Sequence, residues 1–242
     1  MSTSNRWKKA QDYEQRHWEK LAKRIAARQV DLDWYGWKVD RLKNKFLSRI
    51  PHITFEEKKI LEIGSGPVGI ISFLKGKRRY AIDPLMNFYE RDPELIRWRD
   101  KDVKYLQGEG ESLPFQDGNF SLAILDNVLD HTKSPSTVLK EINRVLEPNG
   151  FMYLMVNVHT GLGLTVRFLM EKFQIDKGHP HSYSQKSVRR LLEKIGFEIY
   201  YEELEDYREA KQKELSSDQL KNKLKVLLGI SDIQYEVLAR KG

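Results

Sequence analysis

The stretch Lys59-Ile-Leu-Glu62-Ile-Gly64-Ser-Gly66-Pro-Val-Gly69 decides the fold. Its first half is a short apolar run that predicts a buried strand, and its second half is a glycine-rich turn. Glycines let a chain turn tightly from a strand into a helix, and they let a ligand approach the backbone beside the helix N-terminus. The stretch therefore predicts a ligand-binding loop at the end of the first strand of an α/β domain.

Strands and helices alternate along the chain after this loop. The predicted strands are 79–83, 103–106, 120–126, 151–156, 197–202 and 234–239, and the predicted helices are 70–74, 135–146 and 187–195. This alternation predicts an open, mainly parallel α/β sheet. The connections 157–186 and 203–232 are longer than such a sheet needs, and we expect these insertions to shape a substrate pocket.

The N-terminal segment has a different character. Aromatic and aliphatic residues recur at helical spacing through residues 5–50, and four of the five Trp residues fall there. Residues 1–59 hold 15 Lys and Arg against 8 Asp and Glu, so the whole formal net charge of +7 lies at this end. Either a solvated helix face or a surface for an anionic partner explains this charge. We expect a helical cover over residues 1–52 and the α/β domain over 53–242.

The composition excludes several classes of protein. The chain has no cysteine, which excludes a disulfide framework, a thiolate metal site and a cysteine nucleophile. It has no run of about 18 apolar residues, and its charged start lacks the apolar core of a signal peptide. From these features we expect a soluble, cytoplasmic protein.

Two acids near the glycine-rich loop indicate the kind of ligand. Asp83 ends the second predicted strand, where a carboxylate can accept both hydroxyls of an adenosine ribose in a dinucleotide or in another adenosine ligand. Glu62 lies two residues before Gly64 and would repel a pyrophosphate, but it would attract the positive amino end of an amino acid. The two acids together favour an adenosine ligand with an amino-acid tail.

Three further motifs follow in order, at 108–115 (GEGESLPF), 126–131 (DNVLDH) and 144–150 (RVLEPNG). Together with the glycine-rich loop they resemble the class I S-adenosylmethionine-dependent methyltransferases, in particular the small-molecule branch of ubiquinone and menaquinone type. The resemblance covers roughly residues 58–200. It implies a Rossmann-like seven-stranded sheet with helices on both faces and an antiparallel last strand, and S-adenosylmethionine as the cofactor.

The resemblance also assigns roles to residues. It places the methionine part of the cofactor on the loop, the ribose on Asp83, the adenine beside the motif after the third strand, and further contacts after the fourth strand. The cofactor-binding residues implied in this way are Glu62, Gly64, Ser65, Gly66, Asp83, Glu109, Gly110, Glu111, Asp126 and Asn127.

The acceptor is less defined by the sequence. An alcohol acceptor benefits from a general base, and the candidates are His181 and His179 in the first insertion and His131 after the fourth strand. The hydrogen-bonding groups of that insertion favour a small polar acceptor, such as a hydroxyl of a sugar, glycan or metabolite. No metal site is predicted.

Other functions stay open at this stage. The basic N-terminal helices suit an RNA methyltransferase, although no RNA-binding module is apparent. A non-catalytic cofactor-binding module is a further alternative, and a homo-oligomer is compatible with the sequence. A nicotinamide-dependent oxidoreductase is disfavoured by Glu62 and by the Leu113-Pro-Phe115 motif.

Overall fold

The computed structural model describes residues 3–30, 34–50, 54–173, 180–217 and 219–242. Its strands, as far as the chain is described, form one seven-stranded sheet with the order β3-β2-β1-β4-β5-β7-β6. The strands are β1 (Lys59–Ile63), β2 (Arg78–Asp83), β3 (Val103–Gln107), β4 (Phe120–Asp126), β5 (Leu146–Val158), β6 (Phe197–Leu204) and β7 (Ile233–Lys241). Neighbouring strands from β3 to β5 are parallel, and β7 is antiparallel to both β5 and β6. The predicted Rossmann-like sheet with an antiparallel last strand is confirmed.

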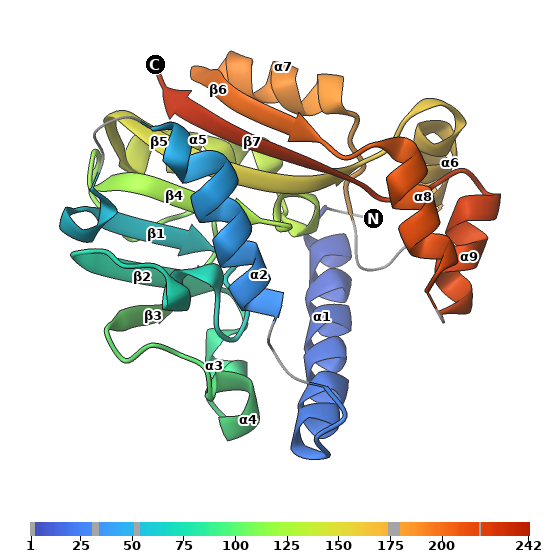
Figure 1. The fold of residues 1–242 in the computed structure, drawn as a ribbon, viewed down its shortest axis with the longest axis horizontal. Coiled ribbons are helices and arrows are strands. Elements are labelled where there is room, and N and C mark those ends of the chain that lie inside the picture. The colour runs from blue at the N-terminus through green and yellow to red at the C-terminus, as the bar shows by residue number, and fades with distance from the viewer. Residues whose placement is uncertain (1–2, 31–33, 51–53, 174–179, 218) are drawn as a thin grey trace.

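The helices lie on both faces of the sheet and at one end of it (Figure 1). They are α1 (Thr3–Ala26), α2 (Trp34–Arg41), α3 (Met86–Tyr89), α4 (Pro93–Ile96), α5 (Pro135–Val145), α6 (Gly161–Lys172), α7 (Gln185–Ile195), α8 (Tyr207–Leu215) and α9 (Leu220–Leu227). Short π or 3-10 turns are η1 (Leu42–Phe46), η2 (Leu47–Arg49), η3 (Phe55–Glu57), η4 (Ile70–Phe73) and η5 (Leu129–His131). None of the helices in the described part of the chain has the length and apolar character needed to traverse a bilayer.

Each central strand supplies side chains to two cores because successive residues point to opposite faces. Ile60 and Ile124 belong to one core, which also contains residues of α1, α2 and η1, whereas Leu61 and Leu125 belong to the other, which α5 and α7 cover. The N-terminal helices are therefore packed onto the sheet and do not form a separate core.

Local signals explain where two of these helices begin and end. Pro135 occupies the first turn of α5, where the missing N–H costs no hydrogen bond. Ser184 and Ser187 form a capping box at the start of α7, and Gly196 ends that helix with a left-handed φ of 98°. Both helices lie within two residues of the predicted ranges.

One predicted helix is different in the structure. The segment expected to form a helix over 70–74 makes only the 3-10 turn η4, and Gly69 before it has a φ of 79°. The reason is the buried Glu62 carboxylate, which accepts hydrogen bonds from the backbone N–H groups of Ile70 and Ile71. These bonds hold the chain after the loop against β1.

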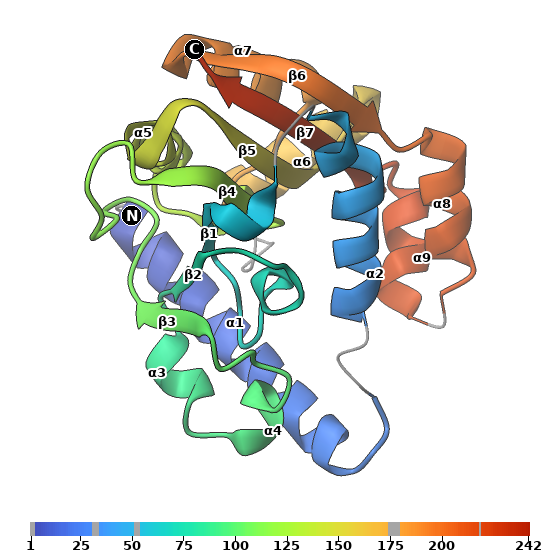
Figure 2. The same ribbon diagram turned by 60° about the vertical axis from the view of Figure 1, so that its left-hand side comes forward.

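The N-terminal helices stand close to the edge of the sheet where the parallel strands end. Figure 1 shows α1 beside the arrowheads of β1 and β2, and α2 in front of the sheet. Figure 2 shows, from a second direction, α1 running past β1, β2 and β3. At this edge a cavity is lined by residues of α1, α2 and the strand ends, and this cavity is the candidate site.

Candidate active site

A cavity of about 440 Å³ opens between the carboxyl ends of β1, β2 and β4 and the N-terminal helices. Ligand pockets of small molecules and cofactors have volumes of roughly 300–1,000 Å³. All ten residues that the sequence proposes for cofactor binding line this one cavity: Glu62, Gly64, Ser65, Gly66, Asp83, Glu109, Gly110, Glu111, Asp126 and Asn127. Four separate stretches of the chain therefore converge on one cavity.

The glycine-rich loop is shaped by what packs against it on both sides. A Cβ on Gly69 would lie 2.5 Å from Glu62 Oε2, so the missing side chain makes room for the buried carboxylate. A Cβ on Gly66 would lie 3.3 Å from Trp18 Cζ2 and 3.5 Å from the Tyr35 hydroxyl. The loop is thus enclosed between β1 and the N-terminal helices.

Glu62 supports the loop as well as lining the cavity. Its side chain is 2% exposed, and its oxygens accept hydrogen bonds from Ile70 N at 3.1 Å and Ile71 N at 2.8 Å. Burial raises the pKa of Glu62 to about 8, against the effect of these two hydrogen bonds. The sequence analysis expected Glu62 to meet a ligand, and the structure adds a role in fixing the backbone of the loop.

Asp83 lies at the end of β2 and is also held by the backbone. Gly66 N donates to Oδ2 at 2.9 Å, and Leu85 N donates to Oδ1 at 2.8 Å. The Tyr89 hydroxyl is a third donor to this carboxylate, so about one of its four lone-pair sites remains for a ligand. Burial raises the pKa of Asp83 to about 6. The group can accept a hydrogen bond from a ribose hydroxyl.

The third side of the cavity is formed by the segment after β3. Lys133 Nζ contacts Glu109 Oε2 at 2.6 Å and lies 3.8 Å from the centre of the Trp7 ring. Glu111 Oε1 accepts hydrogen bonds from the backbone of Lys133 at 2.7 Å and of Ser134 at 3.0 Å. Glu111 therefore fixes the start of α5, while Glu109, which is more exposed, stays at the rim.

A helical wall faces these strand ends, and its side chains were not assigned by the sequence analysis. It contributes aromatic, acidic and basic groups to the cavity: Trp7, Gln11, Tyr13, Glu14, His17 and Trp18 from α1, and Trp34, Tyr35 and Lys38 from α2. The signal for this wall was present in the recurrence of aromatic residues through 5–50. A helical period alone does not show which residues point to a ligand.

Lys38 makes the most direct link between the two walls. Its ammonium group pairs with the carboxylate of Asp126 at the end of β4. Asn127, which follows Asp126, has a φ of 57° and accepts a hydrogen bond from Asn157 Nδ2 at 3.2 Å. A cation from α2 is thus placed among the acids of the strand ends.

Residues 61–154 match the sequence pattern of the methyltransferase domain family. The sheet order and the strand-end cavity agree with this match. Over residues 61–154 the chain is therefore similar to the class I S-adenosylmethionine-dependent methyltransferases. S-adenosylmethionine is the methyl donor of this class.

Individual curated relatives match only part of the chain. The chain is similar to the demethylmenaquinone methyltransferase of Lactococcus lactis, with 39% identity over 62 residues, which is 26% of this chain and 25% of that protein. It is also similar to the sterol 24-C-methyltransferase of Eremothecium gossypii, with 30% identity over 105 residues, 42% of this chain and 28% of that protein. The chain spans a quarter to about half the length of the curated relatives it matches. These relatives do not single out one branch of the class.

Solved structures share the fold. An S-adenosylmethionine-dependent methyltransferase from Thermotoga maritima superimposes with a TM-score of 0.58 at 18% identity and covers 94% of this chain and 98% of its own. A phosphoethanolamine N-methyltransferase from Haemonchus contortus, solved with S-adenosylhomocysteine, gives a TM-score of 0.56 at 15% identity over 83% and 52% of the two chains. At these identities the likeness describes the fold of the methyltransferase domain.

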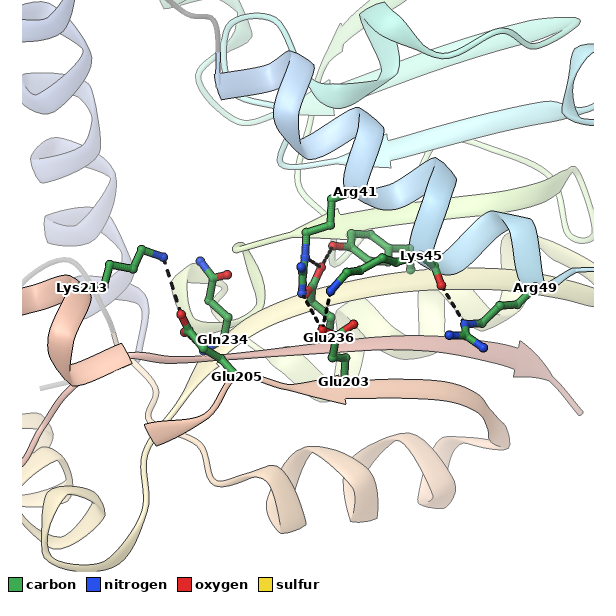
Figure 3. Close-up of polar contacts among 9 residues, drawn as sticks. Arg41, Lys45, Arg49, Glu203, Glu205, Lys213, Gln234 and Glu236 are labelled. Carbon is green, nitrogen blue, oxygen red and sulfur yellow. Dashed lines mark hydrogen bonds and ion pairs between the residues drawn. The ribbon is translucent and has the colours of Figure 1, made fainter. Parts of the chain in front are cut away.

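The α/β domain and the N-terminal helices are held together by ion pairs (Figure 3). Arg41, at the end of α2, pairs with Glu236 on β7, which is 2% exposed and also accepts a hydrogen bond from the Tyr153 hydroxyl at 2.6 Å. Lys45 pairs with Glu203 on β6 at 2.6 Å, nearer the surface. These contacts fix α2 on the sheet and hold Lys38 over the site.

The structure places two of the three candidate histidines. His131 lines the large cavity, one turn beyond β4. His181 does not line it, because its Nε2 lies 3.0 Å from the carbonyl oxygen of Thr132 and its ring borders a second, much smaller cavity. His179 lies outside the described residues. Within those residues, no group of three or more His, Cys, Asp or Glu side chains is arranged to hold a metal ion.

Proposed function

We propose that this protein transfers the methyl group of S-adenosylmethionine to a hydroxyl of a small polar acceptor, such as a sugar, a glycan or another metabolite. One observation carries the proposal: a single cavity is lined by the cofactor motifs and His131 from the sheet side and by aromatic and polar groups of α1 and α2 from the other. Pockets for small molecules combine apolar walls with a few placed polar groups in this way.

The residues of the sheet side fit the cofactor. Asp83 would accept a hydrogen bond from a ribose hydroxyl, and Glu109 with the backbone of Gly110 would meet the adenine. The loop at 64–66 would lie under the methionine part, whose ammonium group suits the acids Glu62 and Asp126. Lys38 supplies a cation for the carboxylate of the same amino-acid tail.

The chain itself has two tasks in the reaction. When bound, S-adenosylmethionine supplies an electrophilic methyl group on a sulfonium. Trp7, Trp34 and the loop enclose the space beside it, which excludes water and orients an acceptor, an effect worth roughly 7–11 kcal/mol when the alignment is good. His131 takes the proton from the acceptor hydroxyl, and such a base typically contributes about 10²–10⁴-fold in rate.

Calorimetry and turnover test this proposal in two stages. S-adenosylhomocysteine should bind, whereas NAD should not. A panel of sugars and hydroxylated metabolites with a labelled methyl donor should then yield a methyl ether. Strong NAD binding without a response to S-adenosylhomocysteine would refute the cofactor assignment, and binding without transfer to any tested acceptor would favour a non-catalytic module.

The role of His131 has its own test. His131→Asn should lower kcat by about 10²–10⁴-fold and leave the affinity for S-adenosylhomocysteine unchanged. The matched control is His181→Asn, since His181 lies outside the large cavity and contacts the backbone of Thr132. Loss of turnover in the control and not in His131→Asn would transfer the role of base to His181.

An RNA acceptor is the second candidate, and the surface of α1 favours it. Exposed basic residues follow one another along this helix, among them Lys9, Arg16, Lys20 and Arg24, with the acids Asp12 and Glu19 between them. Phosphate contacts make RNA affinity fall steeply with salt. Binding of transfer RNA that weakens steeply with salt and is lost on reversing the charges of Lys20 and Arg24 would support this candidate over the small acceptor.

A further inference from the structure

Helix α6 buries a basic side chain and exposes two large apolar ones. Arg167 is 6% exposed, whereas the next two residues, Phe168 and Leu169, are 62% and 46% exposed. Phe173, directly after the helix, is 68% exposed. This is the reverse of the usual surface helix, which buries its apolar stripe and leaves the charged residues in water.

Helix α9 shows the same inversion. Leu220, Leu224 and Leu227 recur at helical spacing and are 71%, 49% and 80% exposed. Lys225 is directed inward, where it pairs with Asp232 and lies 3.7 Å from Glu214. These half-buried ion pairs hold the orientation of the helix, so its leucine stripe remains in solvent.

The two inverted helices are in contact. A Cβ on Gly163 in α6 would lie 1.9 Å from the carbonyl oxygen of Gly229, which follows α9. Arg167 and Lys225 border the same cavity of about 30 Å³. Figure 1 accordingly shows α6, α8 and α9 together at one end of the molecule. We give the name Leu–Phe face to the exposed apolar residues of α6 and α9 and of the positions directly after these helices: Phe168, Leu169, Phe173, Leu220, Leu224, Leu227 and Leu228.

The charge around this face is basic. The α9 sequence Leu220–Leu227 contains three lysines and no acid. Lys223 of α9 and Lys211 of α8 are exposed, beside the exposed acid Glu209. A second copy docked here by a two-fold axis would bring these lysines toward their equivalents, and like charges at an interface are unfavourable. An anionic partner with an apolar interior complements both the leucines and the lysines.

We propose that the Leu–Phe face docks onto an anionic lipid surface. Leucine and phenylalanine side chains would enter the boundary between headgroups and acyl chains while the lysines meet the acidic headgroups, as interfacial helices do. The face adjoins the candidate site through the small cavity, which Asp130 and Asn157 also border, and Asn157 bonds Asn127 of the large cavity. Lipid contact would therefore occur next to the site.

Sedimentation with vesicles tests this surface without reference to methyl transfer. The full-length protein should bind vesicles of equal parts phosphatidylcholine and phosphatidylglycerol, and bind those of phosphatidylcholine alone more weakly. Binding to the anionic vesicles should weaken as salt screens the lysines. The double variant Leu224→Glu, Leu227→Glu should reduce the binding by about tenfold or more, because two charges replace the most deeply inserted groups.

Two controls make the outcome clear. Trp98→Glu removes another exposed apolar side chain, 42% exposed and next to α4, so it should leave vesicle binding unchanged. Thermal melting should show that the double variant stays folded. Equal vesicle binding by the wild type and the double variant overturns the proposal. A wild type that is dimeric in sedimentation velocity, ignores vesicles and becomes monomeric in the double variant also overturns it, and assigns the face to a second copy.

Discussion

The two walls of the cavity are held in place by different forces. On the sheet side, Glu62 and Asp83 accept hydrogen bonds from the backbone of the loop, so the wall is fixed by local contacts close in the chain. On the helical side, α1 and α2 are held by aromatic packing and by ion pairs to strands distant in the sequence, such as Arg41 with Glu236. The sheet wall carries the sequence motifs, and the helical wall carries none of them.

The largest expected effect comes from breaking the main contact of the helical wall. Arg41→Ala leaves Glu236 buried without its cation, which should lower the free energy of unfolding by about 3–5 kcal/mol. The matched control is Lys45→Ala, whose ion pair with Glu203 is more exposed and should cost no more than about 1 kcal/mol. Urea unfolding of both variants measures the difference, and equal small losses would show that α2 is held by packing alone.

The corresponding change in the sheet wall is Glu62→Ala. It leaves the N–H groups of Ile70 and Ile71 without an acceptor, and we expect a loss of about 2–3 kcal/mol in the free energy of unfolding. Glu62→Gln keeps one carbonyl acceptor and should lose about half as much. Loss of S-adenosylhomocysteine binding in calorimetry should follow the loss of loop structure in both variants.

The pH dependence of stability distinguishes Glu62 from a surface acid. Burial raises its pKa from 4.5 to about 8, so between these values the folded protein holds a proton that the unfolded chain has released. The contribution of Glu62 to the free energy of unfolding should therefore decline as the pH rises toward 8. The difference between wild type and Glu62→Gln, measured at several pH values, should show this slope, and a constant difference would contradict it.

The contrast between the walls also explains how much the sequence could predict. The strands and the ten residues of the cofactor side follow from motifs in which a few neighbouring residues specify both a turn and a contact. The wall made by Trp18, Tyr35 and Lys38 could be expected only as a helical cover, because its contacts join segments that no local pattern relates. Even within a motif the prediction was incomplete. The sequence indicated that Glu62 contacts a ligand, but not that it accepts hydrogen bonds from Ile70 N and Ile71 N.

The histidines show a second limit. The sequence favours His181 and His179 of the first insertion as bases, with His131 next. Only the packing of the first insertion turns His181 toward the Thr132 carbonyl and leaves His131 on the large cavity. The exposure of the apolar residues of α6 and α9 could not be predicted from the sequence either. Their apolar periodicity is the same whether it faces the core or the solvent.

A smaller effect is expected where the two walls touch. Gly66→Ala places a Cβ at a φ of 62° and within 3.3 Å of Trp18, and the left-handed backbone alone costs roughly 1–2 kcal/mol. We expect a loss of about 2 kcal/mol in stability, read from thermal melting. Gly36→Ala in α2 is the matched control, since nothing lies within 4 Å of its Cβ and alanine favours a helix. A stabilised Gly36→Ala beside a destabilised Gly66→Ala would locate the strain at the contact of the walls.

The smallest expected effect is the pH dependence of cofactor binding that comes from Asp83. Burial raises the pKa of this carboxyl from 3.8 to about 6, and a ribose is held best by the charged form. Between pH 7 and pH 5 the charged fraction falls about tenfold, so the Kd for S-adenosylhomocysteine should rise by up to about tenfold, equivalent to ~1.4 kcal/mol. Calorimetry at the two pH values measures this change in Kd.

In Asp83→Asn the ratio of the two Kd values should approach one, because an amide does not titrate. In Lys38→Met the ratio should persist, because Lys38 pairs with Asp126 and not with Asp83. A ratio that persists in Asp83→Asn would assign the titration to another group of the cavity and leave the ribose contact without a charged acceptor.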